Sequence, residues 1–342
     1  MNIAVDCRYL GKSGIGRVCE GILDNIGYSQ HNFYLIGNEG YLKKYSKATI
    51  VPDETNPFSK KGLFHFQKKK INRECDCIII PNFIIPFGLK IPVHTIMHDL
   101  IFLDVKETVK GKVDYLIKKT LLKRCMRKST SIACDSAFTK SRCEYHFKKY
   151  INKCYVNYIG LSKNILEFAQ SHKKPTKSDD TIIYVGNVKK HKGLINLLNG
   201  FEKIEGDTYK LKIIGERDNF LNGLKIDEMK YKNVEFTGRI NDEELYIEIQ
   251  NAKYLILLSM YEGFGLPPLE ALYLGTQPII SNIEIFREIY ENLPVLFLND
   301  IDDLSDYVNR KPDIFNCKKE ILAKYNYSNF ASKIIEKICN AL

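Results

Sequence analysis

The chain has 342 residues, which is long for one ordinary domain and suits two domains of middling size. Apolar residues make up 44% of the chain and charged residues 27%, a globular composition that excludes a disordered or collagen-like protein. The net charge is +10, and residues 60–153 carry 21 Lys and Arg against 8 Asp and Glu. The basic excess therefore belongs to one part of the first half.

Three further features of the sequence restrict the class of protein: its start, its most apolar region and its cysteines. No basic stretch leads into a long apolar run at the start, so no signal peptide is expected. The most apolar region, residues 77–89, is interrupted by Pro81 and Pro86 and is too short to span a bilayer. The ten cysteines are scattered without a CxxC pair, which predicts buried reduced thiols of a cytoplasmic protein rather than a zinc site or a disulfide framework.

Strand-like and helix-like segments alternate along the chain, which predicts parallel sheets covered by helices. In the first half we expect strands at residues 3–9, 32–36, 77–80, 93–97, 131–134 and 154–159, and helices at 18–26, 113–128 and 139–149. The apolar pattern thins over residues 161–180, which we interpret as a linker. In the second half we expect strands at 181–185, 211–214, 234–236, 254–258, 277–280 and 294–298, with helices such as 194–204, 242–252 and 267–274.

The strongest motif is YEGFGLPPLE at residues 261–270, directly after a predicted strand. Gly263 and Gly265 allow close backbone approach, and the proline pair that follows suits the first turn of a helix. Such a helix start is a ready anion site. Glu262 and Glu270 flank it, which fits a ligand with a phosphate between two hydroxylated rings. A capped helix with a surface loop is the alternative.

Four weaker motifs also follow predicted strands, where ligands of open parallel sheets bind. YVGNVKKHKG at residues 184–193 offers cations to a leaving diphosphate, although a solvated basic turn is the alternative. KSGIGR at residues 12–17 forms a glycine turn at a helix start, which can approach a phosphate or can be a tight turn alone. His98 precedes Asp99, which could simply orient it, and a lone histidine is more often structural than catalytic. Asp135-Ser136 could cap the next helix.

These motifs together resemble the Glu-x7-Glu signature and its surroundings in the retaining glycosyltransferases of family 4, the glycosyl transferases group 1. The neighbouring sequence also resembles the family's pattern at FTGR (236–239), DEEL (242–245) and Gly275. The resemblance implies the GT-B fold, an α/β architecture of two Rossmann-like domains facing a cleft. It implies an acceptor-binding domain at residues 1–172, a donor-binding domain at 173–324, and a helix at 325–342 that packs back on the first domain.

The resemblance also implies site roles. Glu262 would contact the donor sugar and Glu270 the ribose of the nucleotide. Lys192 matches the family's lysine at the diphosphate, while the family's arginine is missing and Lys189 is its stand-in, without the bidentate fork of arginine. His98 would face the donor sugar. The remaining donor-binding candidates are Gly263, Phe264, Gly265, Leu266, Gly186, Asn187 and Arg239, and those of the phosphate and acceptor loop are Gly14, Gly16 and Arg17.

The implied reaction transfers a hexose, mannose by family analogy, from a nucleotide-diphosphate sugar to a glycan or polyprenyl-diphosphate-linked acceptor in cell-surface polysaccharide or O-antigen synthesis. We find no obvious nucleophile and expect front-face attack with the leaving diphosphate as base. No cofactor and no metal are expected, since no carboxylate cluster of metal spacing occurs.

The basic helix at residues 112–128 predicts contact with the anionic surface at the inner face of a membrane. The alternative is a solvated helix whose apolar side covers the sheet. Nucleic acid is not expected, because no recognition motif accompanies the basic residues. The rival functions are a nucleotide-sugar epimerase on the same fold, a catalytically dead scaffold, and a non-catalytic basic membrane-surface adaptor.

Overall fold

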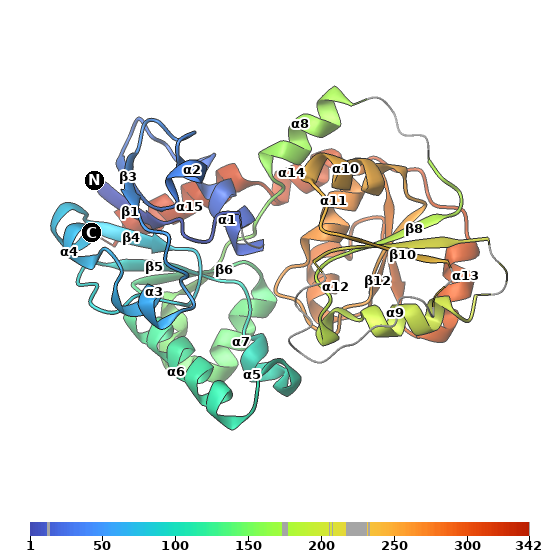
Figure 1. Cartoon of the computed structure of the whole chain (residues 1–342), viewed down its shortest axis with the longest axis horizontal. Coiled ribbons are helices and arrows are strands. Elements are labelled where there is room, and N and C mark those ends of the chain that lie inside the picture. Colours follow the sequence, from blue (N-terminus) through green and yellow to red (C-terminus); the bar gives the residue numbers. More distant parts are fainter. Residues whose placement is uncertain are drawn as a thin grey trace. The chain divides into compact units, whose positions relative to one another are not determined.

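The computed structural model describes residues 1–11, 14–172, 177–204, 206, 208–216, 231 and 233–341. The chain divides into two compact units (Figure 1). Unit 1 comprises Met1–Asp104, Val109–Ser162 and Tyr325–Leu342, and unit 2 comprises Val105–Thr108 and Lys163–Lys324.

Unit 1 is built on seven parallel strands in the order β3-β2-β1-β4-β5-β6-β7. Every position of β4 and β5 is buried, as expected for parallel strands with helices on both faces. The chain runs outward from β1 to β3 and then crosses back to β4, so the strand order reverses between β1 and β4. The strands are β1 Asn2–Asp6, β2 Asn32–Gly37, β3 Thr49–Pro52, β4 Cys77–Ile80, β5 Val93–Met97, β6 Ser131–Cys134 and β7 Cys154–Val156.

Helices cover both faces of this sheet, with α1 and α15 on one side and α6 and α7 on the other (Figure 1). The chain's last helix, α15, packs against α1. Gly21 of α1 makes this contact possible, because a Cβ there would lie 2.5 Å from the Tyr327 ring. The helices are α1 Gly14–Leu23, α2 Glu39–Leu42, α3 Lys60–Phe64, α4 Lys68–Glu74, α5 Ile101–Asp104, α6 Lys112–Lys128, α7 Ala137–Phe147, η2 Lys148–Lys153 and α15 Tyr327–Cys339.

Unit 2 has six parallel strands in the order β10-β9-β8-β11-β12-β13. Its strand order reverses between β8 and β11. The strands are β8 Thr181–Val185, β9 Lys210–Ile214, β10 Val234–Gly238, β11 Tyr254–Leu257, β12 Gln277–Ser281 and β13 Leu296–Leu298. The helices are η1 Lys106–Thr108, α8 Lys163–Ser171, η3 Lys190–Lys192, α9 Leu194–Phe201, α10 Asp242–Asn251, α11 Leu266–Leu274, α12 Glu284–Tyr290, η6 Ile301–Asp303, α13 Leu304–Asn309 and α14 Lys318–Lys324.

The predicted linker at residues 161–180 is wrong over much of its length, because α8 occupies its first half. Ile165 and Phe168 of α8 are buried, and the helix packs against α10 and α11 of unit 2. The division between units therefore falls after Ser162, earlier than the expected boundary at 172. Residues 173–176 of the proposed linker lie outside the described residues. Strand β3 was not predicted, because Pro52 and its polar neighbours hide a short edge strand.

Two predictions about class can be compared with the structure here. Within the described ranges, no helix is long and apolar enough to cross a membrane. All ten cysteines are free thiols, and nine of them are buried.

Candidate active site

The switch point of unit 2 brings together the two strongest predicted motifs. Open parallel sheets bind ligands at the carboxyl ends of the strands where the strand order reverses. The loop after β8 carries residues 186–193 and the loop after β11 carries residues 258–265, and these strands are direct neighbours. Residues 70 positions apart in sequence therefore meet at one edge of the sheet.

Lys192 and Glu262 form the centre of this site. The Lys192 ammonium lies 2.6 Å from each carboxylate oxygen of Glu262. The Ser259 hydroxyl donates to Oε1 of the same carboxylate at 2.7 Å. The carboxylate side chain is 8% exposed, whereas that of Lys192 is 24% exposed. The Glu262 carboxylate is therefore buried and held by hydrogen bonds, whereas the Lys192 side chain remains partly exposed to solvent.

Backbone geometry holds the two loops in register. Gly193 adopts a left-handed φ of 70° and lies so near Leu258 that a Cβ would stand 1.8 Å from the Leu258 carbonyl oxygen. The Met260 amide donates to the His191 carbonyl at 2.8 Å. Burial, followed by the charge of Lys192, lowers the pKa of His191 to about 4, so its ring is neutral near pH 7. The loops are thus joined through backbone as well as side chains.

The start of α11 lies beside this pair. Gly265, the N-cap, has a left-handed φ of 84°, and a Cβ there would stand 2.5 Å from the Phe286 ring. The Tyr290 hydroxyl donates to the Gly265 carbonyl. The following Pro267 and Pro268 have no amide hydrogen, so an anion at this helix start would face the backbone of residues 263–266 rather than proline amides.

Glu270 lies one turn into α11 and is 3% exposed, while the helix around it is otherwise apolar. Its Oε2 atom is buried and receives no hydrogen bond from the described residues. Burying a polar atom in this state is costly, so a ligand hydroxyl that donates to Oε2 explains the glutamate better than packing does. The sequence placed it on the helix that begins at the anion site, and the structure does so too.

The other predicted donor residues surround the same edge. Gly186 directly follows β8, and its amide donates to the Ile214 carbonyl at 2.9 Å. The Asn187 carbonyl accepts from the Tyr184 hydroxyl at 3.4 Å. Lys189 is the N-cap of η3, and Arg239 is exposed directly after β10.

In unit 1, His98 stands at the end of β5 with both ring nitrogens engaged. Nδ1 lies 3.0 Å from an Asp135 carboxylate oxygen, and the Nε2–H group donates to the Pro81 carbonyl at 2.9 Å. Burial opposes charging of the ring, but the hydrogen bond and charge of Asp135 outweigh it and raise the pKa of His98. Burial raises the pKa of Asp135 to about 7, against the opposing effect of its hydrogen bond with His98.

This geometry alters the interpretation of two sequence features. The acid that contacts Nδ1 is Asp135 from the next strand, whereas Oδ1 of neighbouring Asp99 accepts from the Ile101 amide at 3.1 Å. Ser136 is the N-cap of α7 and accepts from the Thr139 amide at 3.0 Å, as capping requires.

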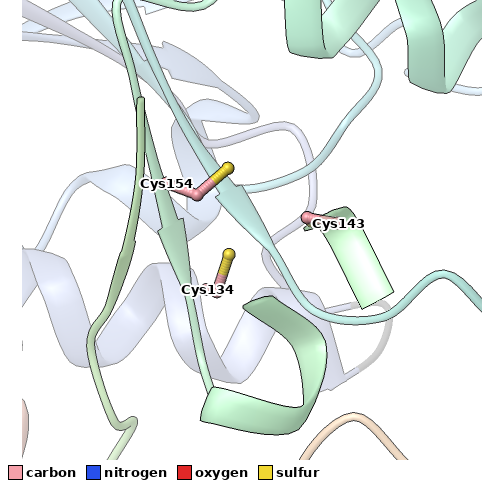
Figure 2. Close-up of side chains that lie close together, drawn as sticks. All are labelled: Cys134, Cys143 and Cys154. Carbon is pink, nitrogen blue, oxygen red and sulfur yellow. The ribbon is translucent and has the colours of Figure 1, made fainter. Parts of the chain in front are cut away.

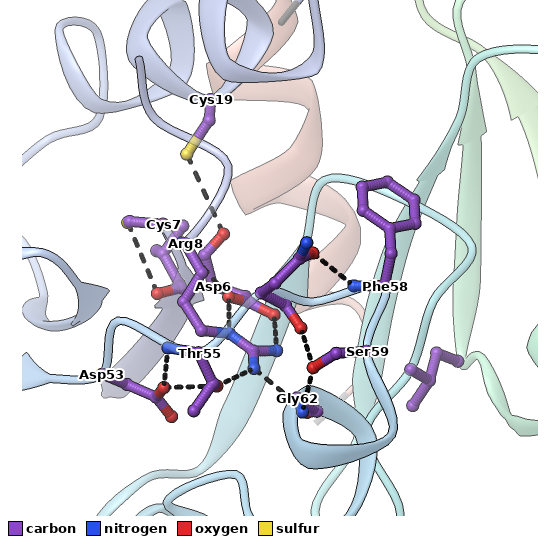
Figure 3. A network of polar contacts seen from close by, with 12 residues as sticks. Asp6, Cys7, Arg8, Cys19, Asp53, Thr55, Phe58, Ser59 and Gly62 are labelled. Carbon is purple, nitrogen blue, oxygen red and sulfur yellow. Dashed lines mark hydrogen bonds and ion pairs between the residues drawn. The ribbon is translucent and has the colours of Figure 1, made fainter. Parts of the chain in front are cut away.

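A buried charged network occupies the end of β1, at the switch point of unit 1 (Figure 3). The Arg8 guanidinium binds both oxygens of Asp6, with Nε–Oδ1 and Nη2–Oδ2 distances of 2.8 and 2.7 Å. Its Nη1 donates to the Thr55 hydroxyl and the Gly62 carbonyl, each at 3.0 Å. Neither side chain of the ion pair is exposed. This pair was not among the predicted site residues, although Asp6-x-Arg8 at a strand end is visible in the sequence.

The glycine turn after β1 lies next to that network. Gly16 sits where a Cβ would be 2.4 Å from the Tyr9 carbonyl oxygen, so close backbone packing explains it. Gly14 begins α1 and has open space around its Cβ position, and Arg17 is half-buried in the same turn. Lys12 and Ser13 of this motif lie outside the described residues.

Both units have the doubly wound parallel sheet, and solved structures share this fold along the whole chain. Anabaena HepE in complex with UDP and glucose superposes with a TM-score of 0.71 at 13% identity, covering 99% of this chain and 100% of HepE. The lipopolysaccharide outer core galactosyltransferase WaaB, in its apo form, gives a TM-score of 0.66 at 17% identity, with full coverage of both chains. The class is therefore the GT-B fold, as predicted.

Sequence comparison gives the family. Residues 166–311, all within unit 2, match the family model of glycosyl transferases group 1. The O-antigen chain mannosyltransferase RfbU of Salmonella typhimurium is 28% identical over 65% of this chain and 64% of its own length. The O-antigen chain mannosyltransferase B of Escherichia coli is 25% identical over 67% of this chain and 63% of its own. The matches thus cover less than two thirds of these relatives. The sequence comparison therefore assigns residues 166–311 to the glycosyl transferases group 1, as the motifs predicted.

Proposed function

We propose that this protein is a retaining hexosyltransferase that moves a hexosyl group from a nucleoside-diphosphate sugar to a hydroxyl of a glycan or lipid-linked glycan. The contact of Lys192 with Glu262 at the switch point of unit 2 carries the proposal. Mannose as the sugar and O-antigen or a related surface polysaccharide as the product are suggested by the names of RfbU and the Escherichia coli relative.

In this proposal unit 2 binds the donor and unit 1 the acceptor. The amides of residues 263–266 and the cations Lys189 and Lys192 receive the diphosphate, because fixed positive charge stabilises the negative charge that develops as the glycosidic bond breaks. Glu270 receives the ribose hydroxyls. The acceptor oxygen bonds to the anomeric carbon, the bond from that carbon to the phosphate oxygen breaks, and the diphosphate takes the acceptor proton. No metal and no cofactor take part.

The Lys192–Glu262 contact has an electrostatic consequence for the donor. The two charges neutralise each other, so an arriving diphosphate attracts the lysine only as far as it competes with the carboxylate. Sugar hydroxyls that donate to Glu262 would free the ammonium for the phosphate. The pair then couples recognition of the sugar to stabilisation of the leaving group, and a bare nucleotide would gain less from Lys192 than a nucleotide sugar does.

A thermal-shift experiment tests the donor site. GDP, UDP, ADP and their sugar conjugates are compared without metal, since a ligand at a hundredfold its dissociation constant adds about 2.7 kcal/mol to the free energy of unfolding. We expect one nucleotide family to stabilise the protein and Glu270→Ala to abolish most of the shift. No shift with any nucleotide would overturn the proposal, and conversion of a nucleotide sugar without any acceptor would replace it with an epimerase.

Glu262→Gln sharpens the same experiment. The amide cannot neutralise Lys192, so affinity for the bare nucleoside diphosphate should rise by up to about fivefold, equivalent to roughly 1 kcal/mol for a partly exposed ion pair. The additional affinity that the sugar contributes should fall. Equal loss for nucleotide and nucleotide sugar would mean that the glutamate only supports the loop.

We propose further that the protein works in the cytoplasm at the inner face of a membrane, bound through α6. Val113, Leu116 and Ile117 were expected either to cover the sheet or to meet lipid, and they are exposed at 74, 63 and 55%. The helix instead buries Leu122 and Met126, with Cys125 between them. The exposed apolar residues share their face with the exposed cations Lys112, Lys119, Lys123 and Arg127.

Not every basic residue of α6 is available to lipid. Lys118 binds Asp114 at 2.8 Å, and Arg124 donates to the carbonyls of Ile85 and Pro86 while its guanidinium lies 4.0 Å from the centre of the Phe87 ring. The exposed cations that remain match an anionic surface at about 1 kcal/mol each, and the apolar residues match its acyl boundary.

Vesicle sedimentation tests this surface. Binding should be stronger to phosphatidylglycerol-containing vesicles than to phosphatidylcholine vesicles and should weaken with salt. Leu116→Glu should reduce it, whereas Ile247→Glu on α10, where the native residue is also exposed, should not. Equal binding of all three proteins would refute the assignment to α6.

A further inference from the structure

Three cysteines of unit 1 come together in the fold, although their spacing in the sequence matches no metal-binding motif. Cys134 ends β6, Cys154 begins β7, and Cys143 lies on α7, which packs on these strands (Figure 2). Their Sγ atoms all lie within 4.8 Å of one another. Among the described residues this is the one group of three or more side chains placed to share a metal ion. We propose that Cys134, Cys143 and Cys154 bind one copper(I) ion as a three-coordinate thiolate site.

The distances suit a metal centre. An ion in the plane of three sulfurs that are at most 4.8 Å apart can lie within about 2.8 Å of each, so inward movement of at most about 0.5 Å gives metal–sulfur bonds of roughly 2.3 Å. Small side-chain rotations supply that movement. The three thiols lie in the core between the sheet and helices α6 and α7, so no backbone segment has to be rebuilt around the ion.

A disulfide fits this arrangement poorly. Ile132 of β6 is the register partner of Cys154, so Cys134 stands two residues further along its strand on the same face. Diagonal neighbours of this kind have Cα atoms about 8 Å apart, beyond the roughly 7 Å that a disulfide allows without backbone movement. Three converging sulfurs, one of them on a helix, share an ion more readily than two of them share a bond.

The number and kind of ligands select the ion. Soft thiolates favour copper(I), zinc and iron–sulfur clusters. Structural zinc takes four protein ligands and iron–sulfur clusters take four cysteines, whereas this group supplies three sulfurs. Copper(I) accepts three soft ligands without a water. Binding forms three copper–sulfur bonds and releases the protons of the thiols to solvent.

The surroundings also favour an anionic sulfur group that takes up a cation. Lys140 lies on α7 three residues before Cys143, and Lys153 directly precedes Cys154, so positive charge lies near the three sulfurs. Cys154 is also the member with some exposure, 6%, whereas the other two have none. An ion therefore enters at Cys154. This inference is independent of the proposed transfer reaction, in which the ion takes no part.

Copper(I) competition under anaerobic, reducing conditions tests the site with the full-length chain. The wild type should withdraw one equivalent of copper(I) from its coloured bathocuproine disulfonate complex and gain a near-ultraviolet sulfur-to-copper band. Cys143→Ser should lose at least tenfold in affinity. Cys77→Ala, which changes a buried cysteine on β4 outside the group, should bind as the wild type does. Equal affinity of wild type and Cys143→Ser would overturn the proposal.

A second measurement needs no variant. X-ray absorption of the wild type with one equivalent of copper(I) should show three sulfur neighbours at about 2.3 Å. Two sulfur neighbours, or a fourth nitrogen or oxygen neighbour, would contradict the three-thiolate site. Zinc(II) bound more tightly than copper(I) in the same competition format would likewise refute the choice of ion.

Discussion

Each sheet of this protein reverses its strand order once, and each reversal carries an oppositely charged pair, but the two pairs differ in what they leave available. At the end of β1, Arg8 and Asp6 are fully buried, and the guanidinium also serves Thr55 and Gly62. At the end of β8, Lys192 keeps 24% of its side chain exposed beside Glu262. A switch point is a place where ligands can bind; whether they do depends on whether its charges are already satisfied by the protein. We interpret the first pair as structural and the second as a ligand site.

The largest effect that would test this comparison is expected from Arg8→Met. The substitution leaves Asp6 as an uncompensated buried charge, which costs about 3–5 kcal/mol of stability. It also removes the cation 4.6 Å from the centre of the Phe66 ring. Urea-dependent hydrogen exchange of β1 peptides measures the loss. Arg73→Met, which breaks an exposed pair with Glu74, is the control and should change little. Comparable small losses in both variants would mean that the buried network does not hold unit 1 together.

The next effect concerns the backbone that joins the two loops of unit 2. Gly193→Ala should cost about 3 kcal/mol, because the new Cβ meets the Leu258 carbonyl in addition to the left-handed strain. Gly275→Ala isolates the strain, since Gly275 has a φ of 85° and open space around its Cβ position. That control should cost about 1–2 kcal/mol. Chemical denaturation of the full-length chain, with a probe of unit 2, compares the stability of the two variants. Equal losses would show that the loops can separate without penalty.

The pair itself should give a smaller effect. Lys192→Met leaves the Glu262 carboxylate with the Ser259 hydroxyl and should cost about 2 kcal/mol in the absence of ligand. Lys212→Met is a matched control, because Lys212 binds both oxygens of Glu248 at 2.9 Å but that carboxylate is 31% exposed. The control should cost less than about 1 kcal/mol. A double-mutant cycle with Glu262→Gln measures the coupling, and a coupling no larger than that of the control pair would remove the distinction between the two.

These residues also show how far the sequence predicts the molecule. Strands such as β4, β5, β6 and β8 were predicted to the residue, because buried parallel strands are continuous apolar runs between turn residues. Helix α8 was missed because its buried residues, Ile165 and Phe168, are too few to stand out among lysines and serines. The two loops that meet at the candidate site could be picked out from the sequence because the residues within each motif are adjacent in the chain. The cysteine cluster and the Asp135 partner of His98 were not, since only tertiary packing brings them together.

The smallest effect tests a single hydrogen bond behind the candidate site. Tyr290 is fully buried at the end of α12, and its hydroxyl donates to the Gly265 carbonyl at the start of α11. Tyr290→Phe keeps the ring and removes this bond, which should cost about 1 kcal/mol. Amides of residues 262–266 should then exchange faster with solvent, because the carbonyl that fixes the loop is released. Tyr307→Phe, which removes a 3.1 Å bond to the Phe297 carbonyl at a half-buried position, should leave those amides unchanged. If Tyr290→Phe also leaves them unchanged, the glycine at the N-cap and the ring packing of Phe286 are sufficient to fix the amides of this loop.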